Sequence, residues 1–412
     1  MEKKRVFSKS LLLLAITSIM LFAMSITSMA ATNQTMNVHQ TGGDDDTITL
    51  EWSSRLGYDH YDVEFSQDGV NWAYMEDTSS PKVTIYNNLS TGSTYYARVK
   101  AYKQGHILGD HDESTALVSE SILVCTAPNK PTNLKQTKAT KNSITMTWNA
   151  VPGATSYQIF IWEDWSYQLV GASNTNSVTI KGLSASSRRS YYVASVKNVN
   201  GYDAVGSKSD DLYAKTLPKK VTRMAINNLW ANIRSCQYKW TTVENADGYQ
   251  YEVTSLNGKK KYYKKTTTSD NFFGDAYPVG TFTKARVRAY VEINGKKTYG
   301  PWSDYEYVAC SKKVTGKRSK DGKKITLKWK KVSGVSEYQI YVSTKEKKGY
   351  KKAATVSSKK TSYTITKYNK KKLKKGQKYY VQLRYVGKNG KKKVVSNIYS
   401  YMDKGCLLYT SD

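Results

Sequence analysis

The chain has 412 residues, a formal net charge of +31 at pH 7 and 39% hydrophobic residues, with tyrosine, at 34, unusually frequent. This apolar and aromatic content excludes a disordered chain, and the length allows two to four domains. Tyrosine and β-branched residues favour pleated, half-buried surfaces, so the composition favours an all-β protein.

The first thirty residues have the features of an export signal. Residues 3–5 give a positive start, residues 11–24 an apolar stretch, and residues 28–30 a small-x-small cleavage site. The apolar stretch is short for a membrane span, and nothing later in the sequence is long enough to be one. We therefore expect a signal peptide at 1–30 and a secreted or cell-surface protein that does not span the membrane after cleavage. An uncleaved membrane anchor is the alternative.

One pattern recurs four times along the chain. A Trp that ends an alternating strand is followed nine residues later by a Tyr that opens another. The pairs are Trp52 and Tyr61, Trp148 and Tyr157, Trp240 and Tyr249, and Trp329 and Tyr338. Successive tryptophans are 96, 92 and 89 residues apart, which is the size of one small β-sandwich. Each Trp and Tyr is therefore predicted to meet at the centre of a two-sheet core.

A second signal, Leu-x5-Tyr followed by alternating apolar residues, lies further along each repeat. It runs from Leu89 to Tyr95, from Leu373 to Tyr379 and, with three extra residues, from Leu183 to Tyr192. Thr283 stands in its place in the third repeat, so we expect that domain to be the least regular. Together the two signals resemble the fibronectin type III family, in which such a Tyr ties down the turn between strands E and F.

The resemblance implies an all-β fold of four tandem Ig-like (fibronectin type III) β-sandwiches. The predicted domains are residues 31–127, which are acidic, 128–218, 219–311, which are divergent, and 312–405, which are very basic. The last seven residues, 406–412, look like the translation of a transposase adapter used in shotgun sequencing. We therefore expect the true C-terminus, and any domain beyond it, to be missing.

The charge is distributed unevenly. Residues 31–127 hold 5 basic and 14 acidic residues, a net charge of −9, whereas residues 312–412 hold 30 basic and 5 acidic residues, a net charge of +25. The two domains between them carry +5 and +7. Such a basic domain attracts polyanions, with a strength that falls as salt rises. The alternative is that lysine only keeps exposed strand edges from pairing.

Lysine occupies most outward positions of the fourth domain. In the family topology the A–B, C–C′ and E–F turns lie at one pole, and the hairpin turn at Asn389-Gly390 lies at the other. The candidate polyanion-binding residues of the three turns are Lys320, Lys323, Lys345, Lys348, Lys370, Lys371, Lys372, Lys374 and Lys375. Those of the opposite pole are Lys391, Lys392 and Lys393.

Other candidate sites are weaker. Trp162 and Trp165 are candidates for stacking on glycans, with packing on the sheet surface as the alternative. Two acidic runs, 44–46 and 109–113, lack the spacing of a calcium loop and are interpreted as solvated turns. Cys236 is predicted to point inward, and the sequence leaves open whether it is bridged to Cys310.

No catalytic, zinc-binding or cofactor-binding motif occurs in the sequence, so we expect no enzyme activity and no cofactor. The expected partners are a cell-wall polymer, an acidic glycan or a host surface protein. No nucleic-acid recognition motif accompanies the charge. Two functions remain. The first is a non-catalytic extracellular adhesion or scaffold array whose basic fourth domain contacts cell-wall or glycan polyanions, and the second is the accessory stalk of a secreted carbohydrate-active or wall-modifying enzyme. The second requires a catalytic domain beyond this fragment.

Overall fold

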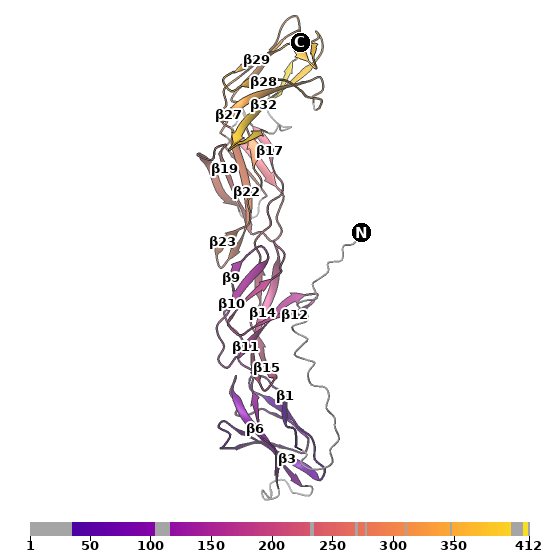
Figure 1. Ribbon diagram of the computed structural model, residues 1–412, viewed down its shortest axis with the longest axis vertical. Helices are drawn as coiled ribbons and strands as arrows, with labels where there is room; N and C mark the ends of the chain where they lie inside the picture. The colour runs from indigo at the N-terminus through magenta and orange to yellow at the C-terminus, as the bar shows by residue number, and fades with distance from the viewer. Residues whose placement is uncertain are drawn as a thin grey trace. The chain divides into compact units, whose positions relative to one another are not determined.

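The computed structural model describes residues 35–103, 116–230, 235–267, 271–276, 278–309, 311–346, 348–396 and 407–410. The predicted signal peptide lies outside these residues. Within them every regular element is a strand, and none of them forms a helix that could cross a membrane. The strands form four β-sandwiches, each with one three-stranded and one five-stranded sheet (Figure 1). The predicted all-β fold of four tandem sandwiches is confirmed.

The chain divides into two compact units. One is built on the first sandwich, which ends at Thr126, and the other comprises Ala127–Asn198 and the residues from Asp203 on. The second unit therefore contains the second, third and fourth sandwiches.

In the first sandwich a sheet of order β1-β2-β5 is paired with one of order β4-β3-β6-β7, and β8 also pairs with β6. The strands are β1 (His39–Gly42), β2 (Ile48–Glu51), β3 (Tyr58–Ser66), β4 (Ala73–Thr78), β5 (Lys82–Ile85), β6 (Thr94–Lys103), β7 (Leu117–Val118) and β8 (Ile122–Cys125). Ile48 and Leu50 of β2 are buried while their neighbours are partly exposed, as expected for a strand with one face in the core.

The other three sandwiches repeat this topology. The second contains β9 (Lys135–Ala139), β10 (Ser143–Thr147), β11 (Ser156–Glu163), β12 (Ser166–Ser173), β13 (Ser177–Lys181), β14 (Arg188–Val199), β15 (Tyr202–Lys208) and β16 (Leu212–Lys215). The third contains β17 (Met224–Trp230), β18 (Ser235–Trp240), β19 (Gly248–Ser255), β20 (Lys261–Thr267), β21 (Phe272–Ala276), β22 (Thr283–Ile293), β23 (Lys296–Tyr299) and β24 (Glu306–Val308).

The fourth sandwich adds a short hairpin. Its strands are β25 (Val314–Arg318), β26 (Ile325–Trp329), β27 (Val335–Ser343), β28 (Lys351–Ser357), β29 (Ser362–Ile365), β30 (Lys367–Tyr368), β31 (Lys371–Lys372), β32 (Tyr379–Asn389), β33 (Lys392–Val395) and β34 (Leu407–Thr410). The hairpin β30–β31 lies between strands E and F. The backbone of β34 pairs with β32, as β8, β16 and β24 pair with their own F strands. That residues 406–412 are foreign to the protein stays a prediction.

The Trp and Tyr of each repeat meet in the core. Their ring centroids are 5.3, 5.1, 5.4 and 5.2 Å apart in the four sandwiches, in edge-to-face or tilted arrangements. The structure also explains the nine-residue spacing. Each Tyr hydroxyl accepts a hydrogen bond from the backbone N–H three residues after the Trp. The donors are Arg55 (3.4 Å), Val151 (2.9 Å), Val243 (2.7 Å) and Val332 (3.0 Å). The ring therefore fills the core while its hydroxyl fixes the B–C turn.

The predicted tyrosine corners form in the first and fourth sandwiches. Tyr95 accepts the N–H of Ser90 at 2.7 Å, and Tyr379 accepts the N–H of Lys374 at 3.1 Å.

The second sandwich differs from the prediction. Tyr191, not Tyr192, is the buried residue, and its hydroxyl has no hydrogen-bond partner among the described residues. Burial raises the pKa of Tyr191 to about 12. The E–F turn is still held by Thr216, whose hydroxyl donates to Ser184 O (2.8 Å) and accepts from Ser187 N (2.9 Å), as Thr126 holds the same turn in the first sandwich.

The third sandwich uses its irregular corner to join the fourth. Thr283 is buried and donates to Val308 O at 3.3 Å. The preceding residue, Phe282, is fully buried together with Leu256 in the hydrophobic core of the fourth sandwich. A Cβ at Gly387 of β32 would overlap Leu256 and lie 2.8 Å from Phe282, so only glycine fits there. The departure from the family pattern at this turn therefore coincides with a contact between two repeats.

Candidate functional site

The three turns predicted to share a pole of the fourth sandwich do so. Arg318 at the end of strand A donates to Lys374 O at 2.6 Å, which ties the A–B turn to the E–F turn. Lys351 donates to Asn369 Oδ1 at 3.0 Å, and Tyr368 donates to Gly349 O at 3.4 Å. These two bonds tie the C–C′ turn to the β30–β31 hairpin. We call the nine lysines of these turns (320, 323, 345, 348, 370–372, 374 and 375) the lysine pole.

All nine side chains of the lysine pole are exposed, and so are Lys391, Lys392 and Lys393. Among the described residues only one of these twelve lysines forms an ion pair: Lys393 Nζ lies 3.1 Å from Glu337 Oε2. The hydrogen bond from Lys393 holds the pKa of Glu337 below its ordinary value. The lysine pole is thus a positive surface, with Asp321 and Glu346 as the carboxylates of its three turns against nine lysines.

Lys391–Lys393 lie apart from the lysine pole. They follow the F–G turn, and Asn389 in that turn contacts the third sandwich through Lys284 (2.8 Å) and Tyr307 (3.0 Å). The structure therefore divides the predicted lysines into two groups at opposite ends of the sandwich.

Two candidate residues stand in unusual backbone conformations. Among the described non-glycine residues with positive φ, all except Trp165, Ser186 and Lys370 are Asn or Asp. Trp165 (φ 65°) is in the β11–β12 turn, and Lys370 (φ 67°) is in the β30–β31 turn. Glycine is the usual residue there, and a large side chain costs energy. The tips of these two hairpins therefore retain Trp and Lys at some cost to stability.

The outer face of the five-stranded sheet in the second sandwich carries a row of aromatic rings in contact with one another. Phe160 and Trp162 lie on the outer side of β11, and the Phe160 ring stacks on Tyr192 at 4.6 Å. Trp162, 43% exposed, packs edge-on against Tyr167 at 4.9 Å. Tyr167 packs against Tyr192 in turn, at 4.6 Å. Trp165 at the neighbouring hairpin tip is 92% exposed. Trp162 thus belongs to a packed row of rings, and Trp165 presents its ring to solvent.

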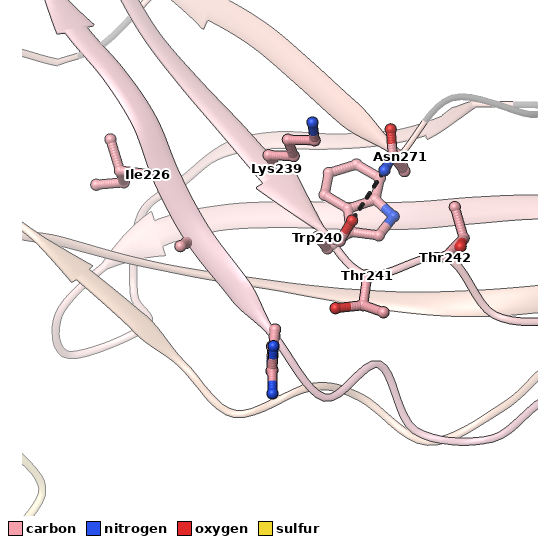
Figure 2. Close-up of a pocket in the computed structure, with 8 residues that line it drawn as sticks. Ile226, Lys239, Trp240, Thr241, Thr242 and Asn271 are labelled. Carbon is pink, nitrogen blue, oxygen red and sulfur yellow. Dashed lines mark hydrogen bonds between the residues drawn. The ribbon is translucent and has the colours of Figure 1, made fainter.

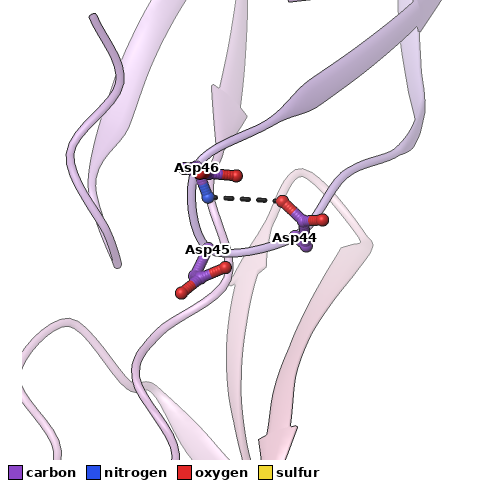
Figure 3. A group of neighbouring side chains, drawn as sticks. All are labelled: Asp44, Asp45 and Asp46. Carbon is purple, nitrogen blue, oxygen red and sulfur yellow. Dashed lines mark hydrogen bonds between the residues drawn. The ribbon is translucent and has the colours of Figure 1, made fainter. Parts of the chain in front are cut away.

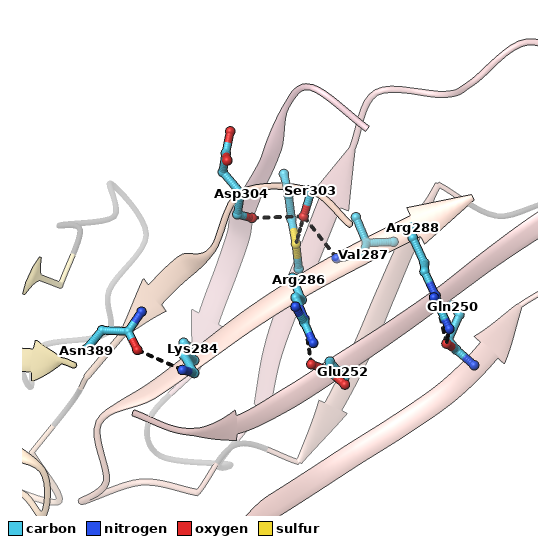
Figure 4. A network of polar contacts seen from close by, with 10 residues as sticks. Gln250, Glu252, Lys284, Arg286, Val287, Arg288, Ser303, Asp304 and Asn389 are labelled. Carbon is cyan, nitrogen blue, oxygen red and sulfur yellow. Dashed lines mark hydrogen bonds and ion pairs between the residues drawn. The ribbon is translucent and has the colours of Figure 1, made fainter. Parts of the chain in front are cut away.

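The third sandwich carries a cationic ladder that the sequence reasoning missed. Arg286 pairs with Glu252 at 2.6 Å and lies over Trp302 at 4.4 Å. Arg288 donates to Gln250 through two nitrogens (Figure 4). Its guanidinium also lies 3.9 Å from the centre of the Tyr299 ring. The signal was the alternation of cations at every second position of one strand.

Lys284 forms the end of this ladder. Its ammonium lies 4.7 Å from the ring centre of Tyr305 and 2.8 Å from Asn389 Oδ1. Burial lowers the pKa of Lys284 and that of Arg288 from their ordinary values. These cations are committed to intramolecular contacts and contribute little to an external anion site.

A hollow of about 470 Å³ opens beside the core Trp240 of the third sandwich. Figure 2 shows Lys239, Thr241 and Thr242 around it, with the amide of Asn271 donating to Trp240 O at 3.1 Å. The charged residues of its lining are Arg223 and Lys239.

The acidic run at 44–46 is a turn. The three carboxylates lie within 4.8 Å of one another and are exposed (Figure 3). Asp44 accepts hydrogen bonds from the Thr47 hydroxyl (2.7 Å) and from Asp46 N (3.3 Å). The bond from Thr47 lowers the pKa of Asp44, while the side-chain bond to Asp44 raises that of Asp46. The second acidic run, 109–113, lies outside the described residues.

Cys236 is a buried free thiol, and burial raises its pKa to about 12. Cys310, its candidate partner in a bridge, lies outside the described residues.

Several curated proteins are similar to parts of the chain. Receptor-type tyrosine-protein phosphatase H from Homo sapiens is 29% identical over 126 residues, 29% of this chain and 10% of the relative. Chitinase A1 from Niallia circulans is 25% identical over 195 residues, 44% of this chain and 25% of the relative. Fibronectin type III domain-containing protein 7 from Mus musculus is 25% identical over 165 residues, 40% of this chain and 21% of the relative. The matches span a quarter or less of each relative's length.

Among solved structures, the crystal structure of the FN1-FN3 domains of chicken CNTN1 aligns with 66% of this chain and 99% of its own, at 15% identity and a TM-score of 0.24. No protein-family model matches the chain.

Proposed function

The chain is an array of tandem fibronectin type III repeats, and we propose that it is a non-catalytic extracellular scaffold whose fourth sandwich contacts cell-wall or glycan polyanions. A repeat array is the architecture of a scaffold or stalk. The observation that carries the proposal is the lysine pole, where three turns bring nine exposed lysines to one end of a sandwich.

The electrostatics of the pole favour this function. Nine exposed lysines share the three turns with only two carboxylates, Asp321 and Glu346, and this excess produces a positive field whose attraction for polyanions falls with salt. The left-handed conformation of Lys370 adds a second argument. Asn or Gly adopts this conformation at lower cost, and a lysine at an unstrained surface position would give the same net charge, so the lysine is placed at this tip for its position. Trp165, at a comparable hairpin tip, is proposed as an auxiliary contact that stacks on sugar rings, with Trp162 beside it.

The proposal is tested by salt-dependent retention of the full chain on heparin and on immobilised teichoic acid. The pole variant carries Lys370→Gln, Lys371→Gln, Lys372→Gln and Lys375→Gln. A matched control removes four exposed lysines of the second sandwich: Lys135→Gln, Lys138→Gln, Lys141→Gln and Lys181→Gln. We expect the pole variant to elute at clearly lower salt than the control. Equal elution of the two variants would show that only net charge matters and would overturn the proposal.

A second function is favoured by the match to Chitinase A1, which covers 44% of this chain. The array would then be the accessory stalk of a secreted carbohydrate-active or wall-modifying enzyme. Reading the gene past codon 405 separates the two: a stop codon soon after strand G supports the stand-alone array, and an open frame encoding a further domain supports the stalk.

A further inference from the structure

The chain leading into strand A lies beside the end of strand B in every sandwich. One backbone hydrogen bond joins the two segments each time. It runs from Ser53 N to Met36 O (2.7 Å), from Asn149 N to Thr132 O (2.9 Å), from Thr241 N to Arg223 O (3.0 Å) and from Lys330 N to Lys313 O (3.1 Å). The residues at this place are uncharged in the first two sandwiches, include one cation in the third and are both lysine in the fourth. The same structural position therefore gains charge along the array.

In the fourth sandwich this place is a basic hollow at the junction with the third. The hollow has a volume of about 560 Å³, and we call it the junction hollow. Its lining consists of Lys312, Lys313, Lys330, Lys331, Ser333 and Gly280. No carboxylate lines it, and none of its four lysines forms an ion pair with a described residue. None of the four belongs to the lysine pole or to the group at 391–393.

The backbone that carries the four lysines is fixed by a buried serine. Ser311 Oγ lies 2.7 Å from Lys330 O and 3.0 Å from Lys313 O, and it accepts the N–H of Lys330 at 3.0 Å. Ser311 is 1% exposed. The backbone of Lys313 and Lys330 is therefore held in place beside the hollow by hydrogen bonds.

The third sandwich supplies the opposite wall. Gly280 O accepts the N–H of Ser333 at 2.8 Å, and Ser333 O accepts the N–H of Phe282 at 2.8 Å. Gly280 has a φ of +86°, and a Cβ there would lie 3.1 Å from Lys312 Cε. Glycine therefore both permits the turn and leaves room for the stem of Lys312.

We propose that the junction hollow binds a phosphate or sulfate group of an anionic polymer, as a second anion site separate from the lysine pole. Four lysines and no carboxylate line the hollow, so an oxyanion there would meet only positive charge and would accept charge-assisted hydrogen bonds from the ammonium groups. The Ser333 hydroxyl supplies an uncharged donor in the same lining. The class of partner, a polyanion, is taken from the proposed function, whereas the position of the site is argued from the residues that line the hollow.

The test compares three double variants of the full chain. The hollow variant is Lys313→Gln with Lys330→Gln, and the pole variant is Lys371→Gln with Lys372→Gln. The control is Lys317→Gln with Lys328→Gln, at exposed positions of strands A and B. The probes are polyphosphate and a heparin oligosaccharide, measured by calorimetry at fixed salt. The amide NMR signals of Gly280 and Ser333 report on the hollow directly.

We expect the hollow variant to bind one or both probes about tenfold more weakly than the control, because two charge-assisted contacts are lost. The Gly280 and Ser333 signals should shift on titration of the pole variant and not of the hollow variant. Weakening confined to polyphosphate identifies a phosphate polymer as the ligand, and weakening confined to heparin identifies a sulfated glycan.

Equal affinities of the hollow and control variants, with no shift at Gly280 or Ser333, would overturn the junction site. If the pole variant is still weakened in that case, the proposed polyanion contact stands without the hollow. If neither the pole nor the hollow variant differs from the control, both proposals are wrong.

Discussion

The third and fourth sandwiches are both basic, with net charges of +7 over residues 219–311 and +25 over 312–412, but they use their cations differently. In the third, Arg286 and Arg288 lie over aromatic rings and bond Glu252 and Gln250. In the fourth, the cations are almost all exposed lysines, and few of them are paired with a described carboxylate. The planar, weakly hydrated guanidinium suits stacking, whereas the strongly hydrated ammonium stays in water. Net charge alone therefore does not locate a binding surface, because residue type and position decide which cations are available.

The largest expected effect concerns the joint between these two sandwiches. Phe282→Ala removes a fully buried ring from the core of the fourth sandwich, and large-to-small changes of this kind cost about 3–5 kcal/mol. Because a chain of four sandwiches does not unfold in one step, hydrogen exchange is the suitable measurement. Amides around Val332 and Gly387 should lose protection.

The control for this prediction is Phe272→Ala in β21 of the third sandwich, where the ring is exposed. In the Phe272→Ala variant the amides around Val332 and Gly387 should keep their protection from hydrogen exchange. Unchanged protection in Phe282→Ala would show that the third and fourth sandwiches are independent.

Removing a cation from the ladder of the third sandwich should lower stability more than removing a lysine from the lysine pole. Arg286→Gln leaves the largely buried carboxylate of Glu252 without its 2.6 Å partner, and hydrogen bonds to charged groups contribute about 1.5–3 kcal/mol. Lys371→Gln, at an exposed position, should change stability by less than about 0.5 kcal/mol. Thermal unfolding of the two variants checks this. Similar shifts would mean that the contrast between the two sandwiches is false.

The core Tyr hydroxyl that fixes the B–C turn in every sandwich gives a smaller effect. Tyr338→Phe keeps the ring and removes the hydroxyl that accepts Val332 N–H at 3.0 Å, at a cost of about 1–3 kcal/mol because a buried donor is left unpaired. Tyr61→Phe, where the distance is 3.4 Å, should cost less. Denaturant unfolding followed by local probes measures both, and a larger loss for Tyr61→Phe would refute the role assigned to the hydroxyl.

The smallest effect is a pH dependence in the fourth sandwich. Because Lys393 holds the pKa of Glu337 below its ordinary value, their pairing stabilises the fold above the unfolded pKa of Glu and is lost as pH falls through the lowered folded pKa. Lys393→Gln should raise the pKa of Glu337, as measured by NMR titration of its carboxylate. An unchanged titration would show that the ion pair does not form in solution.

The sequence contained most of the fold. The spacing from Trp to Tyr predicted the four cores, and the corners at Tyr95 and Tyr379 formed as predicted because a local turn and one strand determine them. The corner of the second repeat was assigned to Tyr192, whereas Tyr191 is buried, because the longer turn changes which residue faces inward.

Much less of the candidate sites was predictable. The gathering of the three turns at the lysine pole followed from the family topology. The junction hollow depends on Lys313 and Lys330 lying side by side, a consequence of strand pairing between Val314 and Trp329 that the sequence does not display. The burial of Phe282 depends on Gly387, about a hundred residues away, and no local pattern connects the two.

The joint at Phe282 has a mechanical consequence. A scaffold anchored at one end and loaded at the other transmits tension through its connections, and an ordinary linker between domains yields first by swivelling. Here the connection includes a buried ring and paired backbone bonds between Gly280, Phe282 and Ser333. Tension on the third and fourth sandwiches would therefore have to break buried packing and backbone hydrogen bonds before the two repeats could separate.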